Sequence, residues 1–491
     1  MIGGQCYKYI VPPLKGKLSN MVFSSVTFLC AFMPVVLLLH TIIHNQRARN
    51  VILLIASLVF YAWGEPIWIA AMLFSTLINY ACARYIDFQI DSKRRKTALA
   101  LGVIISLAAL FYFKYAAFLV NNICSVLRVN YVMPKPKLPI GISFYTFQII
   151  TYTVDVYRKK APVQKNPFRL LLYVCLFPQL IAGPIVRYGD IAEELEYRKV
   201  TIQGIGEGFF RFSLGLGKKV LLANISGEIL NSLPIGMDGS FLSAWVGAVL
   251  FCFQLYFDFS GYSDMAIGLG RMLGFHFLEN FDAPFVSKSI SEFWRRWHIS
   301  LGTFFREYVY IPLGGNRVSL PRWILNTMIV WGLTGIWHGA NWNFLIWGLY
   351  FGALIILERT LLRNVLEKIP DWIKHTGTVI LAVIGFVMFR FESFFQMGEQ
   401  LYKMFVPWKT ALSDAYVIYA LKHNILFLLI CIVCCFPIRK TIVKLFNNRK
   451  KHGYKNILRS YLKAFLAVTI ICLSILFLVG QSFNPFLYFR F

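Results

Sequence analysis

The sequence is poor in charged side chains, which make up only 15% of its 491 residues. Soluble domains carry about 25% charged residues, so the composition excludes an ordinary soluble enzyme. Hydrophobic residues make up 57% of the chain, and apolar runs of about 18 residues or more, long enough to cross a bilayer, recur along it. These runs are continuous rather than alternating, which favours helices over the strands of a barrel. The sequence therefore predicts an all-α polytopic membrane protein.

Acidic residues are the scarcer charged class: 23 Asp and Glu stand against 50 Lys and Arg, a formal net charge of +27. The basic residues do not gather on one soluble face, as nucleic-acid binding would require. They cluster at the ends of apolar runs, which fits the positive-inside rule and attraction to membrane lipids. We therefore expect no nucleic-acid partner and a cytoplasmic position for the basic clusters at 47–49, 93–96, 158–160 and 438–463.

The ten cysteines form no evident framework. Cys431, Cys434 and Cys435 share one apolar run and act most simply as small apolar side chains, because a metal site would need a second pair or nearby histidines. Familiar catalytic loops are missing as well. The GLG at 268–270 lacks the third glycine of a nucleotide-binding loop, and the GYS at 261–263 lacks the closing glycine of a nucleophile elbow. We expect no metal site and no permanently bound cofactor.

The apolar runs and their interruptions outline the membrane topology. The first run begins near Met21 without the small-residue site of a cleaved leader, so we expect it to be retained. The stretch 168–186 is broken by Pro178 and Pro184, which predicts a re-entrant segment covered by protein or lining a cavity. With no soluble domain or low-complexity tract evident, one integral domain over 1–491 is the simplest organisation. Candidate spans fall near 22–44, 51–64, 67–87, 98–121, 139–157, 205–224, 241–273, 323–337, 343–362, 376–391, 415–437 and 462–481.

The densest polar region runs from 254 to 316. Within it, Ser289 and Glu292 have the spacing of a capping box, which predicts a helix over about 290–308. An amphipathic helix lying at the membrane interface is the alternative to a catalytic role for this segment. One face of this helix is expected to carry Trp294, Trp297 and Leu301, and its cations are Arg295, Arg296 and Arg306.

Two histidines lie in apolar surroundings: His298 on that predicted helix, and His338 in the string TGIWHGANW, 334–342. Each alone is more often a packed core residue than a catalytic one. Together with Asp258 and Asp264 they indicate a functional site, because ionisable groups within a membrane are costly. A neutral imidazole that takes a proton from an attacking hydroxyl is worth about 10²–10⁴ in rate. A dry, enclosed site also protects a reactive acyl group from hydrolysis.

Several long strings resemble the membrane-bound O-acyltransferase family over nearly the whole chain. The bacterial alginate and peptidoglycan O-acetyltransferases are the most similar branch, and the D-alanyl transfer protein of teichoic acid synthesis is related. The strings are PIGISFYTFQIITYTVDVYR (139–158), FPQLIAGPIVRY (177–188), QLYFDFSGYSDMAIGLGRMLGF (254–275), SISEFWRRWHISLGTFFREYVYIPLGGNR (289–317) and GIWHGANWNFLIWG (335–348).

The resemblance implies a ring of about 11–13 transmembrane helices with re-entrant segments around a central funnel. Its core would cover about 50–360, with further spans and a tail over 376–491. His338 matches the family's catalytic histidine, and His298 matches a second histidine with a positioning or polarising role. Side chains expected to support them or to bind substrate are Asp258, Arg295, Arg296, Trp297, Glu307, Trp337 and Asn341.

The resemblance also implies an activity. An acyl group, most simply acetyl, would pass from a cytoplasmic thioester (acetyl-CoA or an acyl carrier protein) across the bacterial cytoplasmic membrane. An extracytoplasmic esterase-like partner would complete its transfer to a cell-envelope or exported polysaccharide. Two alternatives stay open: D-alanyl transfer to teichoic acid from a carrier protein, and a transporter or flippase that moves a lipid-linked substrate without chemistry.

The tail PFLYFRF, 485–491, is rich in aromatic residues. An interfacial aromatic anchor is the simpler interpretation. The tail also resembles a short aromatic-tyrosine terminus in this acyltransferase branch, which implies that Tyr488 is a transient acyl carrier whose phenolic oxygen a base activates.

Overall fold

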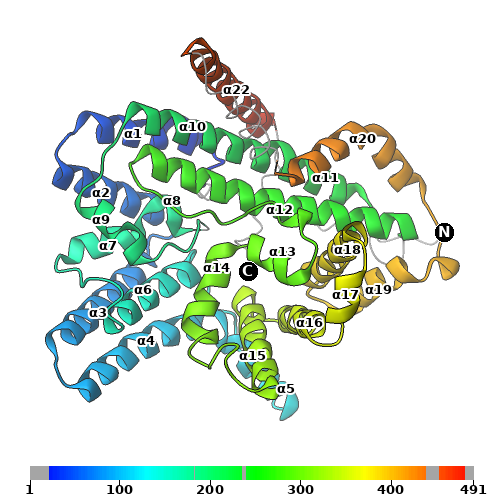
Figure 1. Cartoon of the computed structure of the whole chain (residues 1–491), viewed down its shortest axis with the longest axis horizontal. Helices are drawn as coiled ribbons and strands as arrows, with labels where there is room; N and C mark the ends of the chain where they lie inside the picture. The colour runs from blue at the N-terminus through cyan, green and yellow to red at the C-terminus, as the bar shows by residue number, and fades with distance from the viewer. Residues whose placement is uncertain (1–20, 182, 235–238, 438–452, 481–491) are drawn as a thin grey trace.

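The computed structural model describes residues 21–181, 183–234, 239–437 and 453–480 (Figure 1). Every regular element in these ranges is a helix, which confirms the all-α prediction. Six helices are long and apolar enough to cross a membrane. They are α3 (Ile69–Phe88), α4 (Ser92–Lys114), α12 (Phe241–Met272), α18 (Asp371–Arg390), α20 (Ala415–Cys435) and the part of α22 (Gly453–Gly480) from Ser460 onward.

The other predicted spans correspond to shorter or more polar helices. Segment 22–44 contains η1 (Phe28–Phe32) and α1 (Met33–Ile42), and segment 205–224 contains α10 (Ile202–Gly217) followed by η2 (Lys218–Asn224). The remaining four are α2 (Gln46–Gly64), α6 (Ile142–Tyr157), α15 (Leu320–His338) and α16 (Trp342–Arg359). Short connecting helices are α5 (Ala116–Val126), α9 (Tyr188–Glu196), α11 (Ile225–Ser232), α17 (Arg363–Lys368) and α19 (Phe394–Phe405).

Two short helices, α13 (Ile290–Arg296) and α14 (Ile299–Phe305), lie near the middle of the molecule (Figure 1). In that view α2, α3, α4 and α6 lie to one side of them, α15 and α16 below, and α18, α19 and α20 to the other side. The long helix α12 crosses beside them and is buried along most of its length. The polar region 254–316 is therefore surrounded by the apolar helices.

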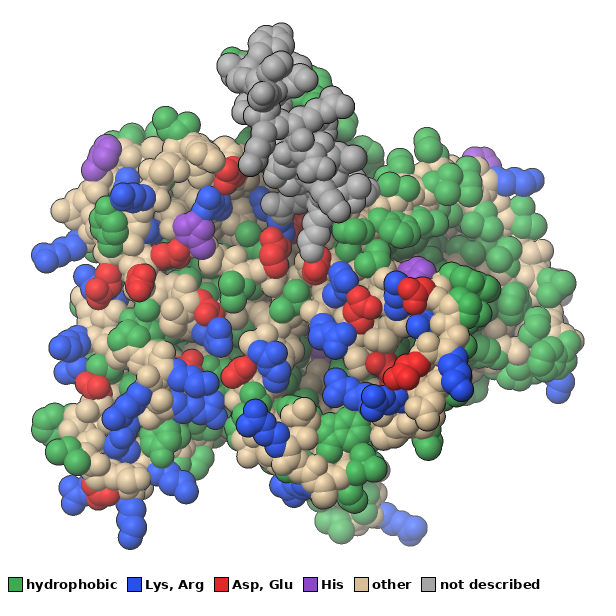
Figure 2. Space-filling model, viewed as in Figure 1, with side chains coloured by type: hydrophobic (Ala, Val, Ile, Leu, Met, Phe, Trp, Pro, Cys, Tyr) green, Lys and Arg blue, Asp and Glu red, His purple; other side chains and the backbone are tan. Residues whose placement is uncertain are grey.

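Charged side chains lie over the middle of the face shown in Figure 2, whereas hydrophobic side chains gather along its right-hand edge. Exposed apolar residues on α20 include Leu426, Leu429, Ile430 and Val433. Large apolar side chains exposed on the outer helices are expected where a helix faces lipid.

The basic clusters at 93–96 and 158–160 lie at the same end of the helices. Arg95, at the start of α4, donates to the carbonyl of Tyr157 at the end of α6, 3.2 Å away. At the opposite end, Lys137 pairs with Glu65 at 2.9 Å, just beyond α2 and just before α6. These contacts place the two clusters at the same end of the helices. The cluster at 438–452 lies outside the described residues.

The described part of the broken segment from Leu170 to Val186 is covered by protein, as predicted. It forms α7 (Pro167–Cys175) and the single turn α8 (Phe177–Leu180), and Tyr173 and Leu180 are both 0% exposed. Side chains satisfy its interrupted backbone: Ser57 accepts from the Phe177 amide at 3.1 Å, and the Tyr173 hydroxyl donates to the Val186 carbonyl at 2.9 Å. The irregular backbone is tolerated because neighbouring helices supply these partners.

Candidate active site

His338 is the last residue of α15 and is only 6% exposed. Aromatic rings enclose its imidazole: the ring centroids of Trp347 and Phe389 lie 5.0 and 5.3 Å away, and both rings are nearly perpendicular to it. Trp347 belongs to α16, which packs closely on α15. The glycine at 335 permits this approach, since a Cβ atom there would collide with the Phe344 carbonyl. The two helices thus hold the histidine in an apolar enclosure.

His298 lies in a turn that separates two short helices, α13 and α14. The prediction of one continuous helix over 290–308 is therefore wrong. The capping part holds, since the Ser289 hydroxyl accepts from the Glu292 amide at 3.0 Å. The helix nevertheless ends at Arg296, and α14 begins only after His298 has adopted the left-handed conformation (φ 47°, ψ 54°). Histidine is among the side chains enriched there.

Asn280 explains the break. Its carbonyl accepts from the Ile299 amide at 2.9 Å, and its side-chain oxygen accepts from the Ser300 amide at 3.1 Å. The same oxygen lies 3.1 Å from His298 Nδ1. Because an amide oxygen only accepts hydrogen bonds, Nδ1 is the protonated nitrogen and the ring's lone pair is on Nε2. A partner eighteen residues away therefore fixes both the turn and the tautomer.

The structure does not support the alternative of an amphipathic helix lying at the membrane interface. Trp297 is 5% exposed, and its ring packs on Phe386 and Phe293 at centroid distances of 4.9 and 5.6 Å. Trp294 contacts Phe351 at 4.8 Å. The tryptophans are therefore in the protein interior, because α13 is packed against α16 and α18.

Trp337 connects the two histidines. Its ring centroid lies 4.8 Å from that of His338 and 6.0 Å from that of His298, and the side chain is 4% exposed. The structure thus brings together three of the predicted site residues, which come from strings forty positions apart in the sequence.

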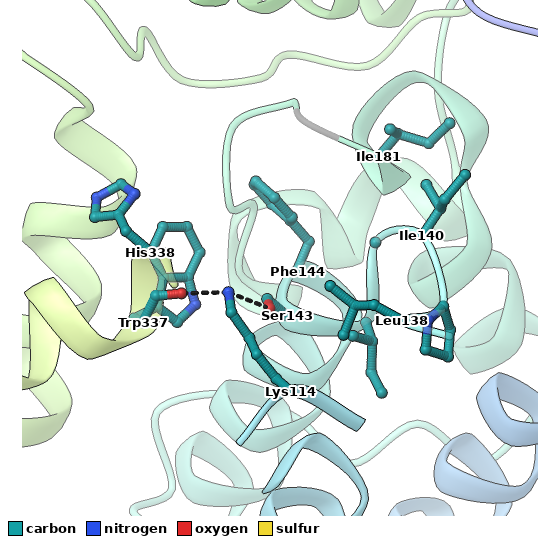
Figure 3. A pocket seen from close by; sticks show the side chains of 11 residues that line it. Lys114, Leu138, Ile140, Ser143, Phe144, Ile181, Trp337 and His338 are labelled. Atoms are coloured by element: carbon teal, nitrogen blue, oxygen red, sulfur yellow. Dashed lines mark hydrogen bonds between the residues drawn. The ribbon is translucent and has the colours of Figure 1, made fainter. Parts of the chain in front are cut away.

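A cavity of about 60 Å³ lies beside His338 and Trp337. Its other walls are the approach to α6 at 138–144, together with Ile181 and Lys114. Figure 3 shows Lys114 reaching from the end of α4 toward Trp337 and Ser143, with His338 beyond Trp337. The Lys114 ammonium donates to the Trp337 carbonyl and lies 3.5 Å from the Ser143 hydroxyl.

A second cavity, of about 40 Å³, lies on the α14 side. Ser300, Phe304, Thr151 and Arg187 are among its walls. Since Thr151 follows Ser143 by eight residues on α6, the two cavities are offset by roughly 12 Å along that helix. Three rings stand between them. Phe147 stacks on Phe304 of the second cavity at 3.9 Å and lies 5.7 Å from Trp337 of the first.

The predicted acidic residues are engaged in ion pairs. Asp258 on α12 pairs with Lys219 at 2.7 Å, and both side chains are almost fully buried. Asp264 pairs with Arg211 at 2.5 Å and with Lys218 at 2.7 Å. These pairs join α12 to α10 and η2, and they stabilise the wall beside the site.

The remaining predicted residues that the structure describes are not among those that line the His338 cavity. Arg295 is exposed, and Arg296 pairs with Glu292 at 2.8 Å. Glu307, on η5 (Arg306–Tyr310), pairs with Lys160 at 3.7 Å. Asn341 precedes α16 without a side-chain cap. Tyr488 lies outside the described residues.

Sequence reasoning missed Lys114, Ser143 and Asn280. Only Lys114 had a usable signal, because it interrupts the apolar run predicted at 98–121. Ser143 and Asn280 are recognisable only once the fold brings them to the cavity and to the His298 turn.

Comparison with known proteins agrees with this arrangement. Residues 103–398 match the membrane-bound O-acyltransferase family, MBOAT. The chain is 37% identical to the probable alginate O-acetylase AlgI of Azotobacter vinelandii, over 96% of this chain and 100% of that protein. It is 30% identical to the peptidoglycan O-acetyltransferase of Helicobacter pylori, over 96% and 98%. It is also 30% identical to the teichoic acid D-alanyltransferase of Bacillus subtilis, over 53% and 71%. The chain is a multi-pass membrane protein that belongs to the membrane-bound O-acyltransferase family.

Proposed function

We propose that this chain transfers an acetyl group toward the hydroxyls of a cell-envelope or exported polysaccharide. The observation that supports this most directly is the position of His338, buried at a helix end beside a small cavity and next to Trp337 and His298. A general base for acyl transfer needs this combination of enclosure and access for a reacting hydroxyl.

In the proposed reaction, His338 takes the proton of an acceptor hydroxyl as its oxygen attacks the carbonyl carbon of a thioester. A C–O bond forms, the C–S bond breaks, and the departing thiolate recovers the proton from the imidazolium. His298 acts as a positioning group for Trp337 and for the acceptor, since its own ring is fixed by Asn280. The stacked rings of Phe304, Phe147 and Trp337 limit water flow between the cavities, which protects the acyl group.

The proposal includes a direction. With the basic clusters at 93–96 and 158–160 in the cytoplasm, the second cavity lies toward the cytoplasmic end and the His338 cavity toward the external end. The donor is then a cytoplasmic thioester, acetyl-CoA or an acyl carrier protein, and the membrane is the bacterial cytoplasmic membrane. The acceptor in the His338 step is a sugar hydroxyl or the hydroxyl of Tyr488. When it is Tyr488, this residue carries the acyl group to an extracytoplasmic esterase-like partner, which completes the transfer.

D-alanyl transfer is the second candidate, supported by the likeness to the Bacillus subtilis enzyme. That likeness covers about half of this chain, whereas the likeness to the two O-acetylating relatives covers nearly all of it. The length of the match therefore favours acetyl. The transporter alternative has no support from relatives whose names all describe group transfer.

The test is transfer of a radiolabelled acyl group by inside-out membrane vesicles that contain the full-length chain. Label from acetyl-CoA should become covalently attached to glycan or protein in wild-type vesicles and not in vesicles with His338→Ala. If label is transferred only from D-alanyl carrier protein, the transferred group is D-alanyl rather than acetyl. No covalent label from either donor would leave a transporter as the better explanation.

A further inference from the structure

Lys114 is a cation that neither the sequence motifs nor the proposed mechanism uses. It is the last residue of α4 and lines the His338 cavity. None of the described residues that line this cavity has a carboxylate, and the remaining walls are mostly apolar: Leu138, Pro139, Ile140, Ile142, Phe144 and Ile181. A lysine in such surroundings without a carboxylate partner is costly, which points to a role beyond packing.

Its observed contacts leave part of the ammonium group available. The group has three N–H donors. One reaches the Trp337 carbonyl, and the Ser143 hydroxyl lies at 3.5 Å, the long limit of a hydrogen bond. Among the described residues these contacts supply no negative charge, because the partners are a carbonyl, a hydroxyl and the ring of Trp337, whose centroid lies 5.6 Å from the ammonium nitrogen.

A purely structural role for Lys114 would be to cap the C-terminal end of α15. Cations near a helix C-terminus stabilise its last carbonyls, and Lys114 does bind the carbonyl next to His338. Tyr115 binds the preceding carbonyl, that of Ile336, at 3.1 Å. The neutral hydroxyl of the next residue, Tyr115, thus caps a carbonyl at the same end of α15. Capping alone therefore does not require a charged group in the cavity.

We propose that Lys114, with Ser143 beside it, is the anion-binding site of the His338 cavity. The group bound there is an oxygen atom that carries negative charge, and it has two possible sources. One source is the oxyanion that develops on the acyl carbonyl when the acceptor oxygen attacks it. The other is a carboxylate on the acceptor itself. The Lys114 ammonium supplies charge and a hydrogen bond, while the proton transfers remain those of His338. This inference rests on the proposed acyl transfer.

The matched variants are Lys114→Met, which keeps the side-chain volume and removes the charge, and Tyr115→Phe, which removes only a helix-capping hydroxyl. In wild-type vesicles radiolabelled acetyl-CoA should give covalent transfer. Lys114→Met should lower the rate about 10²-fold, the usual loss when a donor to a developing oxyanion is removed, and Tyr115→Phe should stay within a few-fold of wild type.

The kinetic constants separate the two sources. If Lys114 binds the transient oxyanion, kcat falls and the KM values for donor and acceptor change little. If it binds an acceptor carboxylate, the KM for an anionic acceptor rises while a neutral sugar acceptor reacts as in wild type. Wild-type transfer by a folded Lys114→Met protein, or equal losses in Lys114→Met and Tyr115→Phe, would overturn the inference.

A second measurement needs no variant. Acetate should inhibit transfer by the wild-type chain at concentrations where acetamide, of the same shape but neutral, has no effect. Equal effects of the two compounds contradict an anion site. Wild-type vesicles that give no transfer would overturn the proposed function and this inference with it, whereas transfer that is indifferent to Lys114 overturns this inference alone.

Discussion

His298 and His338 are both buried, at 2% and 6% exposure, but the protein holds them by different means. His298 lies in a turn with a left-handed backbone and is fixed by a polar partner, Asn280. His338 lies at a helix end and is enclosed by the rings of Trp347 and Phe389. His298 is not among the residues that line either cavity, which suits a positioning role. A histidine enclosed by rings beside a cavity suits proton transfer.

The largest effect is expected from His338→Ala. Acyl transfer should fall by about 10²–10⁴, the usual contribution of a general base, while membrane insertion and yield remain normal. The measurement is labelled-acetyl transfer per amount of folded protein. His423→Ala is the matched control, because His423 is exposed on α20 and its contacts are with Tyr419 in its own helix, the carbonyl by a hydrogen bond and the ring by stacking. Transfer by His338→Ala at the His423→Ala rate would contradict the assigned role.

His298→Ala should lose less, because the base remains in place. We expect roughly a 10- to 100-fold decrease in kcat, the scale of the loss from misplaced reacting groups. His375→Ala is the control, since His375 is half-buried and contacts a carbonyl, that of Ser287, at 3.2 Å. A loss equal to that of His338→Ala would assign both histidines to proton transfer and remove the distinction between them.

The two sites also differ in how far the sequence predicted them. His338 could be located from its flanking tryptophans and apolar runs, since α15 and α16 follow the hydrophobic pattern directly. The all-helical fold and the shared side of two basic clusters followed from local composition in the same way. The turn at His298 could not be predicted, because a strong capping signal at Ser289 favoured a continuous helix and the opposing partner, Asn280, is not adjacent in sequence.

Close packing of α15 on α16 supports the enclosure of His338, and Gly335→Ala tests it. The added Cβ would collide with the Phe344 carbonyl on the neighbouring helix, so we expect the free energy of unfolding to fall by about 1–3 kcal/mol, as for other overpacked sites. Gly377→Ala, within α18, has no atom within 4 Å of the new Cβ and should be neutral or stabilising by up to about 1 kcal/mol. Thermal unfolding in detergent measures both. Equal stability of the two variants would mean that the glycine contact does not hold the helices together.

The smallest expected effect comes from Ser300→Ala, which weakens the His298 turn without removing its main partner. The Ser300 hydroxyl donates to the Asn280 oxygen at 2.9 Å and accepts from the Ile185 amide at 3.0 Å, so it links the turn to the broken segment 168–186. Its loss should cost about 0.5–1.5 kcal/mol of stability, the net value of a typical hydrogen bond.

The rate effect of Ser300→Ala tests which partner, Asn280 or the Ser300 hydroxyl, positions the ring of His298. Because Asn280 still holds His298 Nδ1 and the Ser300 amide, transfer should drop only a few-fold, and the loss should appear in kcat rather than in the KM for the donor. Thr327→Ala is the control, since that buried hydroxyl donates within α15 to the Trp323 carbonyl at 2.9 Å and should leave kcat unchanged. A loss in Ser300→Ala as large as in His298→Ala would show that the hydroxyl, rather than the amide of Asn280, positions the ring.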